Sequence, residues 1–529
     1  MATRRGFLAL LGQVGGAAAV QGALGALGLG VARADEPFAP IRTERGRGRK
    51  VLVLGGGIAG MTAAWELGKL GYAATVLEAA DRPGGRCFSI RRGTRVVDTD
   101  GEAQTCTFDS GQYYNCGPAR IPGFHVTLDY CRALGVPVEM MINRNPAAFD
   151  YTTRGPLAGQ RLRQKEVEGD QDGYVAELLA KAVGAKALDA ELDEKDRANL
   201  LDYLSSFGWL EKDGRYAGTE RSRGFSALPG AADQRGTVGT PLPRSAVLAR
   251  ELGFRHFFLR SPLQQPAMLQ IVGGTDQLAH AFARALGPRL MLGAPVRELR
   301  QDERGVRVLY GAAGKIREAR AEYAVCALPL TILRDLPADL PASLRAAVAS
   351  VPYEAAGKIG IQFGRRFWEE DDRIFGGNSS TDQTITQIMY PSTGMLGKKG
   401  VLVGYYTFLK QAAELQAMPH AQRLETALAQ GERLHPQYRR HFENAFSMAW
   451  GKMPWLHGSW AAWGETGPRA DAYSEICKPA GRVHFAGDAM SYQTGWMAGA
   501  IESARRAVLA IHQRASAEPA LAVPPEVKP

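Results

Sequence analysis

The chain has 529 residues, of which 45% are hydrophobic and 22% charged, a balance typical of a folded globular protein with two or three structural units. Its net charge is +10, but basic residues are mixed with acids, and the densest basic run, residues 42–50, is interpreted as a solvated linker. Because no zinc-finger spacing or aromatic-basic segment accompanies this charge, we do not expect nucleic-acid binding.

The N-terminal segment, residues 1–34, has the pattern of a twin-arginine signal peptide. Two arginines, Arg4 and Arg5, precede a weakly apolar stretch rich in Ala, Gly and Leu, and residues 32–34 supply the small side chains of a cleavage site. The glycine-rich character argues against a membrane anchor, although an uncleaved leader stays open as an alternative. We expect a periplasmic or secreted protein whose mature chain begins near Asp35 and has no stable membrane span.

A dinucleotide-binding unit follows the linker. Residues 51–54 predict a buried parallel strand, and Gly55, Gly57 and Gly60 occupy the G-x-G-x-x-G positions. Without a Cβ these residues permit a tight turn and close approach of the backbone to a pyrophosphate, which faces the N-terminus of a helix predicted from residue 58. The next strand ends at Glu78, whose carboxylate is placed to accept a hydrogen bond from a ribose hydroxyl. This order of elements predicts an adenine dinucleotide site.

Two later segments look like further pieces of the same fold. A Gly-Gly turn at residues 273–274 opens a helix that strands follow, and a strand at 482–488 ends in Gly-Asp before a helix at 497–512. We therefore predict an α/β protein with one interrupted, Rossmann-like domain. The predicted units are the dinucleotide-binding domain at 46–90, 265–325 and 470–514, a mixed-sheet substrate domain at 91–150 and 326–469, a helical insertion at 151–264 and a disordered tail at 515–529.

The cysteines and histidines predict no metal site. None of the six cysteines forms a C-x-x-C pair, and the nine histidines show no ligand spacing. An exported protein could pair Cys106 with Cys116, but folding before export favours free, buried thiols, so no structural disulfide is expected.

Taken together, these motifs resemble the flavin-dependent amine oxidases and, within them, the L-amino acid oxidases. The resemblance covers nearly all of the mature chain, and it implies the glutathione-reductase-like fold of that family with bound FAD. Monoamine oxidases attach FAD through a cysteine, and the corresponding residues 491–495 contain none, so the FAD should be non-covalent. The motifs that carry the resemblance are Gly55 to Glu78, Arg82-Pro-Gly-Gly-Arg86, Gly117-Pro-Ala-Arg-Ile-Pro122, Gly357-Lys358, Gly400-Val-Leu-Val-Gly-Tyr405, Phe485-Ala-Gly-Asp488 and Gly495-Trp496.

The resemblance also implies a set of FAD-binding residues. Asp488 corresponds to the acid near the ribityl and pyrophosphate groups, where venom-type enzymes have the longer Glu, and the helix from Met497 would direct N–H groups to the flavin C2 carbonyl. The guanidinium groups of Arg82 and Arg86 could fork onto phosphate oxygens. The residues expected at FAD are Gly55, Gly57, Ile58, Ala59, Gly60, Glu78, Ala79, Gly85, Arg86, Gly117, Pro118, Ala119, Arg120, Val296, Gly487, Asp488, Trp496 and Met497.

Five residues are expected to act on the substrate. Lys358 resembles the family lysine that holds a water against flavin N5, and Arg120 the arginine that grips the substrate carboxylate with a bidentate fork. Tyr405 matches the tyrosine that completes this grip, and Trp496 and Trp460 are expected to line the pocket. The structural alternatives are a surface lysine, a phosphate-binding or salt-bridged arginine, and aromatic residues of an ordinary core.

The function that the resemblance implies is FAD-dependent oxidation of L-amino acids by dioxygen, which yields 2-oxo acids, ammonia and hydrogen peroxide. Three alternatives stay open: a primary-amine or polyamine oxidase, an amino-acid monooxygenase that forms an amide, and a non-catalytic FAD-binding partner protein. The sequence does not name the preferred side chain, and a homodimer is consistent with the family.

Overall fold

The computed structural model describes residues 46, 48–249, 252, 261–463 and 468–518. The predicted signal peptide at 1–34 and residues 519–529 of the predicted tail lie outside the described residues. Within these ranges no helix combines the length and the apolar character that crossing a membrane requires.

One five-stranded parallel sheet collects strands from all three segments that were predicted to form the dinucleotide-binding domain. Residues 51–54 of its central strand are buried, as expected for a strand covered on both faces. Strands from the beginning, the middle and the end of the chain therefore build a single sheet. Its order is β11 (Leu290–Met291), β2 (Ala73–Leu77), β1 (Lys50–Leu54), β15 (Tyr323–Cys326) and β21 (Val483–Phe485).

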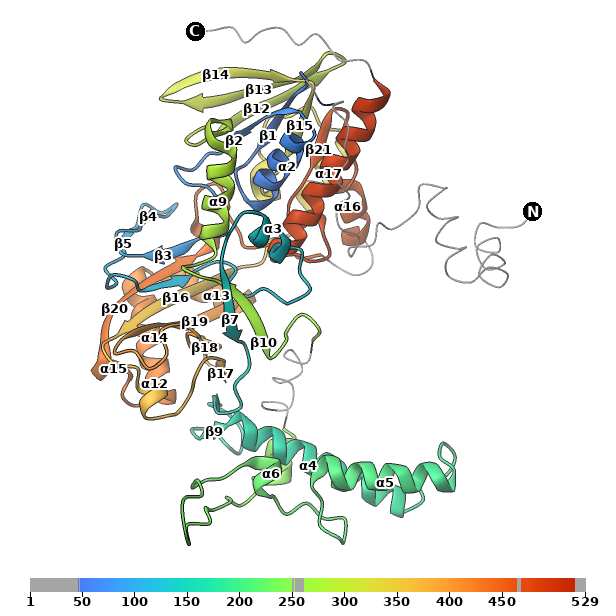
Figure 1. Cartoon of the computed structure of the whole chain (residues 1–529), viewed down its shortest axis with the longest axis vertical. Helices are drawn as coiled ribbons and strands as arrows, with labels where there is room; N and C mark the ends of the chain where they lie inside the picture. Colours follow the sequence, from blue (N-terminus) through green and yellow to red (C-terminus); the bar gives the residue numbers. More distant parts are fainter. Residues whose placement is uncertain (1–45, 47, 250–251, 253–260, 464–467, 519–529) are drawn as a thin grey trace, which may run out of the picture.

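Helices cover one face of this sheet and a three-stranded antiparallel sheet with two further helices covers the other (Figure 1). The helices of the first face are α2 (Ile58–Lys69), α9 (Asp276–Leu286), α17 (Met497–Ala517) and the short α3 (Thr127–Ala133). The elements of the second face are β12 (Val296–Asp302), β13 (Gly305–Ala312), β14 (Lys315–Ala321), α11 (Ala342–Ser350) and α16 (Pro468–Ile476). Because α17 continues to Ala517, residues 515–517 are helical, which corrects the predicted start of the tail.

A seven-stranded mixed sheet forms the centre of the second domain. Every residue of its strand β16 is buried, and this strand pairs antiparallel with both β19 and β20. The sheet order is β20 (Phe442–Ala449), β16 (Ala356–Phe363), β19 (Gly400–Phe408), β18 (Gln387–Met389), β17 (Asn378–Thr381), β8 (Phe149–Tyr151) and β9 (Arg161–Arg163). Associated elements are the ribbons β3 (Ser89–Arg91) with β6 (Tyr113–Asn115) and β4 (Arg95–Val97) with β5 (Ala103–Thr105), and the helices α12 (Phe367–Glu370), α13 (Leu409–Ala417), α14 (His420–Leu434) and α15 (Tyr438–His441). The short α10 (Leu330–Leu333) packs instead against α11 in the first domain.

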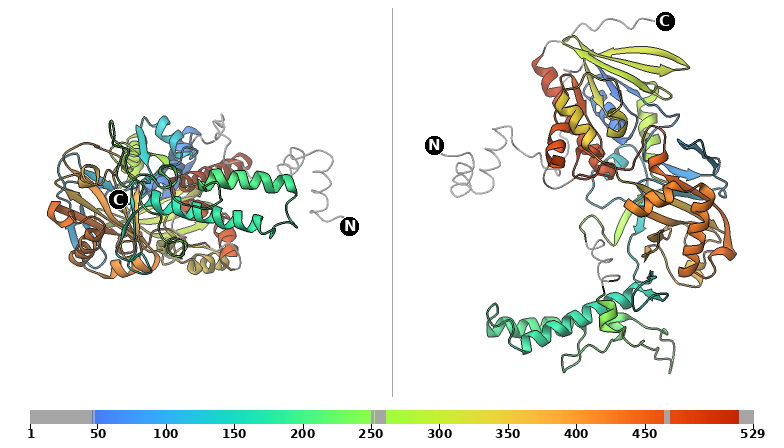
Figure 2. Two further views of the ribbon diagram at one scale, coloured as in Figure 1. Left: turned by 90° about the horizontal axis from the view of Figure 1, so that it is seen from below. Right: turned by 180° about the vertical axis from the view of Figure 1, so that it is seen from behind.

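The helical insertion projects from the body of the molecule as an arm (Figures 1 and 2). Its two long helices, α4 (Gln164–Gly184) and α5 (Glu194–Gly208), pack antiparallel, and α6 (Glu220–Arg223) and α7 (Arg244–Val247) lie against α4. The two-stranded ribbon of β7 (Val138–Ile142) and β10 (Ala267–Ile271) brackets the insertion in the chain. We call this ribbon with residues 143 and 264–266 the neck of the arm.

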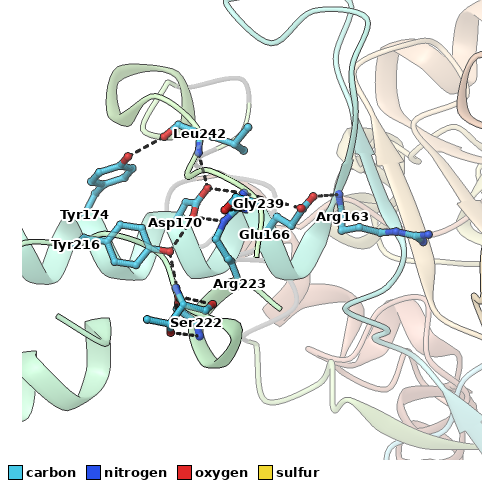
Figure 3. Close-up of polar contacts among 10 residues, drawn as sticks. Arg163, Glu166, Asp170, Tyr174, Tyr216, Ser222, Arg223, Gly239 and Leu242 are labelled. Atoms are coloured by element: carbon cyan, nitrogen blue, oxygen red, sulfur yellow. Dashed lines mark hydrogen bonds and ion pairs between the residues drawn. The ribbon is translucent and has the colours of Figure 1, made fainter. Parts of the chain in front are cut away.

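A buried ion pair joins the arm's long loop to α4 (Figure 3). Asp170, which is fully buried, accepts hydrogen bonds from Arg223 Nε at 2.9 Å, from the hydroxyl of Tyr216 at 2.8 Å and from the backbone N–H of Leu242 at 2.8 Å. The apolar cluster of the arm is small. A charge buried without such partners would be costly, so this network fixes residues 216–242 on the helix.

Candidate active site

A cavity lies between the two domains, and residues of both line it. The expected FAD-binding residues that line it are Gly55, Gly57, Ile58, Ala59, Glu78, Ala79, Gly85, Arg86, Gly117, Pro118, Val296, Gly487, Asp488, Trp496 and Met497. Lys358 and Trp460 line it as well. Gly60, Ala119, Arg120 and Tyr405 are not among its lining residues.

The glycine turn after β1 has the geometry of a phosphate cradle. Gly55 has φ +101°, and a Cβ on Gly60 would lie 1.9 Å from the carbonyl oxygen of Gly55, so helix α2 can approach the turn only without that side chain. A Cβ on Gly57 would meet no atom within 4 Å, and Gly57 lines the cavity, so a side chain there would fill the space that a ligand needs. The N-terminus of α2 adds free N–H groups and a positive dipole end beside this space.

Glu78 is held in place at the end of β2. Its carboxylate accepts hydrogen bonds from the backbone N–H of Gly56 and, at 2.8 Å, from that of Ala80. Burial raises the pKa of Glu78, and these backbone donors oppose the rise. Each oxygen keeps a lone pair, so the acid can accept from a ribose hydroxyl while it is fixed by the backbone. Turn, helix and acid together fit an adenine dinucleotide.

The two arginines of the Arg82–Arg86 turn have partners within the protein. The guanidinium of Arg86 forks onto the carboxylate of Asp488, with Nη1 3.0 Å from Oδ2, and its other amino group also bonds Asp488. Arg82 donates to the carbonyl of Gly85 at 2.9 Å and lies 3.6 Å over the ring centre of Phe88. Arg86 therefore holds Asp488, and Arg82 fixes the turn, in the wall of the cavity that both residues line. Their contact with phosphate oxygens stays a prediction.

Lys358 is a buried cation without a carboxylate partner among the described residues. Its ammonium donates to the backbone carbonyls of Asn115, at 3.1 Å, and Gly117, and it lies 4.3 Å from the ring centre of Tyr406. Burial and, to a smaller extent, the nearby charge of Arg120 lower the pKa of Lys358 to about 7. Near neutral pH this side chain can therefore hold or release a proton at the cavity wall.

Tyr406, not Tyr405, faces the cavity. Successive side chains of a strand point to opposite faces, and Tyr406 pairs directly with Lys358 across β16 and β19, so the two share a face. Tyr405 is 1% exposed and packs into the apolar cluster on the other side of the sheet with Ile359 and Leu402. Tyr405 was expected at the cavity, and Tyr406 is the tyrosine of this strand that lines it, so the sequence assignment is shifted by one residue.

Arg120 lies next to the cavity-lining residues Gly117 and Pro118, and its charge acts on Lys358 and Tyr406. Its Nη1 donates to the side-chain oxygen of Asn143 at 3.0 Å, and among the described residues no carboxylate pairs with it. Burial lowers the pKa of Arg120, although a guanidinium stays charged at any ordinary pH. A partly buried positive charge with only a neutral partner is suited to an anionic ligand.

Aromatic side chains form much of the remaining wall. Trp460 packs on Phe408, and Trp496 packs edge-on against His125, with ring centres 5.1 Å apart. Trp450 and Trp455 also line the cavity, and neither was identified from the sequence, because both lie in a segment after β20 that carries no recognisable motif. The indole N–H of Trp450 donates to the carbonyl of Cys116 at 3.0 Å.

The six cysteines are free thiols. Two of them, Cys87 and Cys116, line the cavity, and burial raises the pKa of each to about 12. Since the thiolate is the reactive form, these groups are inert packing elements at ordinary pH.

Comparison with known proteins agrees with this geometry. The family model described as flavin containing amine oxidoreductase matches residues 58–512. The putative L-amino-acid oxidase YobN of Bacillus subtilis is 27% identical over 486 residues, which cover 88% of this chain and 95% of that protein. The flavin-dependent L-tryptophan oxidase RebO of Lentzea aerocolonigenes is 28% identical over 496 residues, 88% of this chain and 98% of RebO.

Solved structures show the same fold. Putrescine oxidase bound to putrescine aligns with a TM-score of 0.59 at 21% identity, covering 88% of this chain and 99% of that one. Cyclohexylamine oxidase from Brevibacterium oxydans aligns with a TM-score of 0.60 at 19% identity and the same coverage. The chain therefore belongs to the family of flavin-containing amine oxidoreductases, and its cofactor is FAD, for which the glycine turn and Glu78 provide the dinucleotide cradle.

Proposed function

We propose that this protein is an L-amino acid oxidase. The observation that carries the proposal is Arg120, a partly buried guanidinium beside the cavity whose only side-chain partner among the described residues is a neutral amide. Simple amines have no carboxylate to occupy such a charge, whereas an amino acid does. The relatives named L-amino-acid oxidases, which align over most of the chain, support the same substrate class.

The overall reaction consumes an L-amino acid, dioxygen and water and releases a 2-oxo acid, ammonia and hydrogen peroxide. FAD, when bound, supplies the acceptor for the hydride that leaves the substrate α-carbon and delivers the two electrons to dioxygen. Arg120 binds the carboxylate, and the hydroxyl of Tyr406, on the same side of the sheet as Lys358, is the second polar group available to it.

Other residues control water and protons. The indoles of Trp460 and Trp496 cover the cavity wall and exclude water from the reacting carbon. Lys358 Nζ, whose pKa is lowered to about 7 by burial and by the charge of Arg120, can keep or release a proton at the same wall. The substrate amine must be neutral before the α-hydrogen leaves as hydride, so activity rises with pH.

The test compares matched pairs of substrates. Flavin-loaded enzyme is supplied with each L-amino acid and with the amine of the same side chain, and peroxide and organic product are measured. We expect peroxide and a 2-oxo acid from the amino acids and much slower turnover of the amines. Faster turnover of the amines would identify an amine oxidase, and an amide product would identify a monooxygenase.

We also propose export by the twin-arginine route, which rests on residues 3–8 and 32–34 alone. Replacing Arg4 and Arg5 by lysine should leave the precursor in the cytoplasm, as measured by fractionation of the expressing cells. Unchanged export of that variant would contradict the route.

A further inference from the structure

Several internal arginines of the described chain pair with a carboxylate, and Arg120 does not. Arg223 pairs with Asp170, Arg366 with Glu369, and Arg86 with Asp488, and each of those guanidinium charges is offset by a carboxylate. Arg120 is instead held by Asn143, whose amide oxygen accepts a hydrogen bond but adds no negative charge. The charge of Arg120 is thus fixed in position without being neutralised.

The amide of Asn143 can adopt only one orientation. Its Nδ2 donates to the backbone carbonyl of Gln265 at 3.0 Å and to Oε1 of Gln264 at 3.3 Å. Because a backbone carbonyl can only accept, the nitrogen must face Gln265, and the oxygen must face Arg120. The side chain is fully buried, so no water competes for these bonds.

The backbone around Asn143 is held as firmly as its side chain. Its N–H donates to the carbonyl of Pro266 at 2.9 Å, and its carbonyl accepts from Nδ2 of Asn378 at 2.8 Å. Asn143 directly follows β7, and Gln265 lies just before β10, so these contacts are made in the neck of the arm (Figure 1).

The same neck holds the backbone next to Arg120. Ile121 exchanges two backbone hydrogen bonds with Leu269 of β10, at 2.7 and 2.9 Å, and the N–H of Gly123 donates to Oε1 of Gln265 at 3.0 Å. Both the backbone and the guanidinium of the Arg120 segment are therefore anchored to one ribbon. Such support from neighbouring groups is what fixes a binding side chain within the tolerance that recognition needs.

We propose that Asn143 is the positioning residue of the carboxylate site: it orients the Arg120 guanidinium from the neck of the arm and leaves its positive charge available to the substrate. This inference rests on the proposed function, since it takes Arg120 as the carboxylate-binding group. The inference makes a specific claim about charge, because an aspartate of the same shape would still accept from Arg120 but would compete with the substrate for its positive charge. The second carboxylate oxygen would lose the bonds to Gln264 and Gln265, a cost that the control below reproduces.

The experiment measures binding of two probes to flavin-loaded enzyme by the change in flavin absorbance. One probe, 4-methylpentanoate, keeps the carboxylate of leucine without the amine, and the other, 3-methylbutylamine, keeps the amine without the carboxylate. In Asn143→Asp we expect the Kd of the carboxylate to rise about 10- to 100-fold, as for loss of one charge-assisted contact, with no weakening for the amine. Asn143→Ala keeps the charge of Arg120 but frees its side chain, and we expect a rise of about 3- to 10-fold.

Asn145 provides the matched control. It lies two residues further along, and its Nδ2 likewise donates to two backbone carbonyls, those of Phe375 and Gly376, while its oxygen accepts from the N–H of Ala147. Asn145→Asp and Asn145→Ala should therefore reproduce the cost in Tm without changing the Kd of the carboxylate. If either aspartate variant fails to fold, Asn143→Ala and Asn145→Ala are compared instead.

The outcomes separate the two proposals. If Arg120→Ala weakens the carboxylate and both Asn143 variants match their Asn145 counterparts, the positioning role is wrong and the proposed function stands. If Arg120→Ala leaves the Kd of the carboxylate unchanged, the proposed function itself loses its support. Equal weakening of both probes by Asn143→Asp would indicate a general structural role and would overturn the inference.

Discussion

Truncation of Arg120 is the perturbation on which the proposed function depends. The side chain makes one hydrogen bond, to Asn143, and offsets no buried carboxylate among the described residues, so Arg120→Ala strands a single amide oxygen. A stranded neutral acceptor costs about 1–3 kcal/mol, which a folded domain of this size tolerates. The hydrogen bond of Arg120 goes to Asn143 and not to the glycine turn or to Glu78, so the variant should retain its flavin.

The expected loss of activity follows from the contact that is removed. A charge-assisted, bidentate contact to a carboxylate in a partly desolvated site contributes about 2–4 kcal/mol. This corresponds to a fall in kcat/KM of about thirty-fold to about a thousand-fold for amino acids. Arg120→Lys should restore only part of it, because an ammonium cannot reproduce the planar fork.

The assay compares peroxide formation from L-leucine and from 3-methylbutylamine in wild type and variant, with flavin occupancy measured from the visible spectrum. The amine never used the contact, so its turnover should fall much less than that of leucine. An equal fractional loss for both compounds, with FAD retained, would refute the assignment of Arg120 to the carboxylate.

Three further substitutions test the site and the arm. Tyr406→Phe should raise KM for amino acids several-fold, whereas Tyr405→Phe should change only thermal stability. A raised KM for Tyr405→Phe alone in steady-state assays would restore Tyr405 as the tyrosine beside the substrate. Lys358 is protonated below its pKa of about 7, so a cation that assists dioxygen should make flavin reoxidation, measured by stopped flow, slower as pH rises through 7. In Lys358→Met reoxidation should be slow and independent of pH in this range, and traces that match wild type would exclude a role for the residue. Asp170→Ala removes the 2.9 Å ion pair of Arg223 and leaves Glu166, at 3.9 Å, as the remaining carboxylate beside this buried guanidinium. Breaking a buried pair costs up to about 3–5 kcal/mol, so hydrogen exchange in residues 216–242 should accelerate at constant flavin occupancy. Unchanged protection would show that the pair with Asp170 does not hold the loop.

The fold could be predicted from the sequence where chemistry imposes a local pattern. The α/β class, the FAD cofactor and the family are confirmed, because a dinucleotide demands glycines and an acid at fixed spacing in one strand–turn–helix–strand unit. The same reasoning correctly places Glu78 beside the turn, because Glu78 and its hydrogen-bond donor Gly56 both belong to that unit.

The details that failed depend on contacts between distant segments. Tyr405 and Tyr406 are neighbours in one strand, and only the register with Lys358 on β16, including a bulge between Ile359 and Gly360, decides which of them faces the cavity. Arg86 and Asp488 are 402 positions apart, so no local pattern reveals that one neutralises the other.

The order of strands in the parallel sheet has a consequence for synthesis of the protein. β1 and the glycine turn leave the ribosome first, but β21, Asp488 and helix α17 come from the last part of the chain. A nascent chain that ends before β21 lacks one wall of the cradle, and its strand β15 is paired on one side with β1 and exposes its other, apolar edge. We therefore expect stable capture of the flavin to follow synthesis of β21, and a chain truncated before Asp488 to retain the flavin poorly.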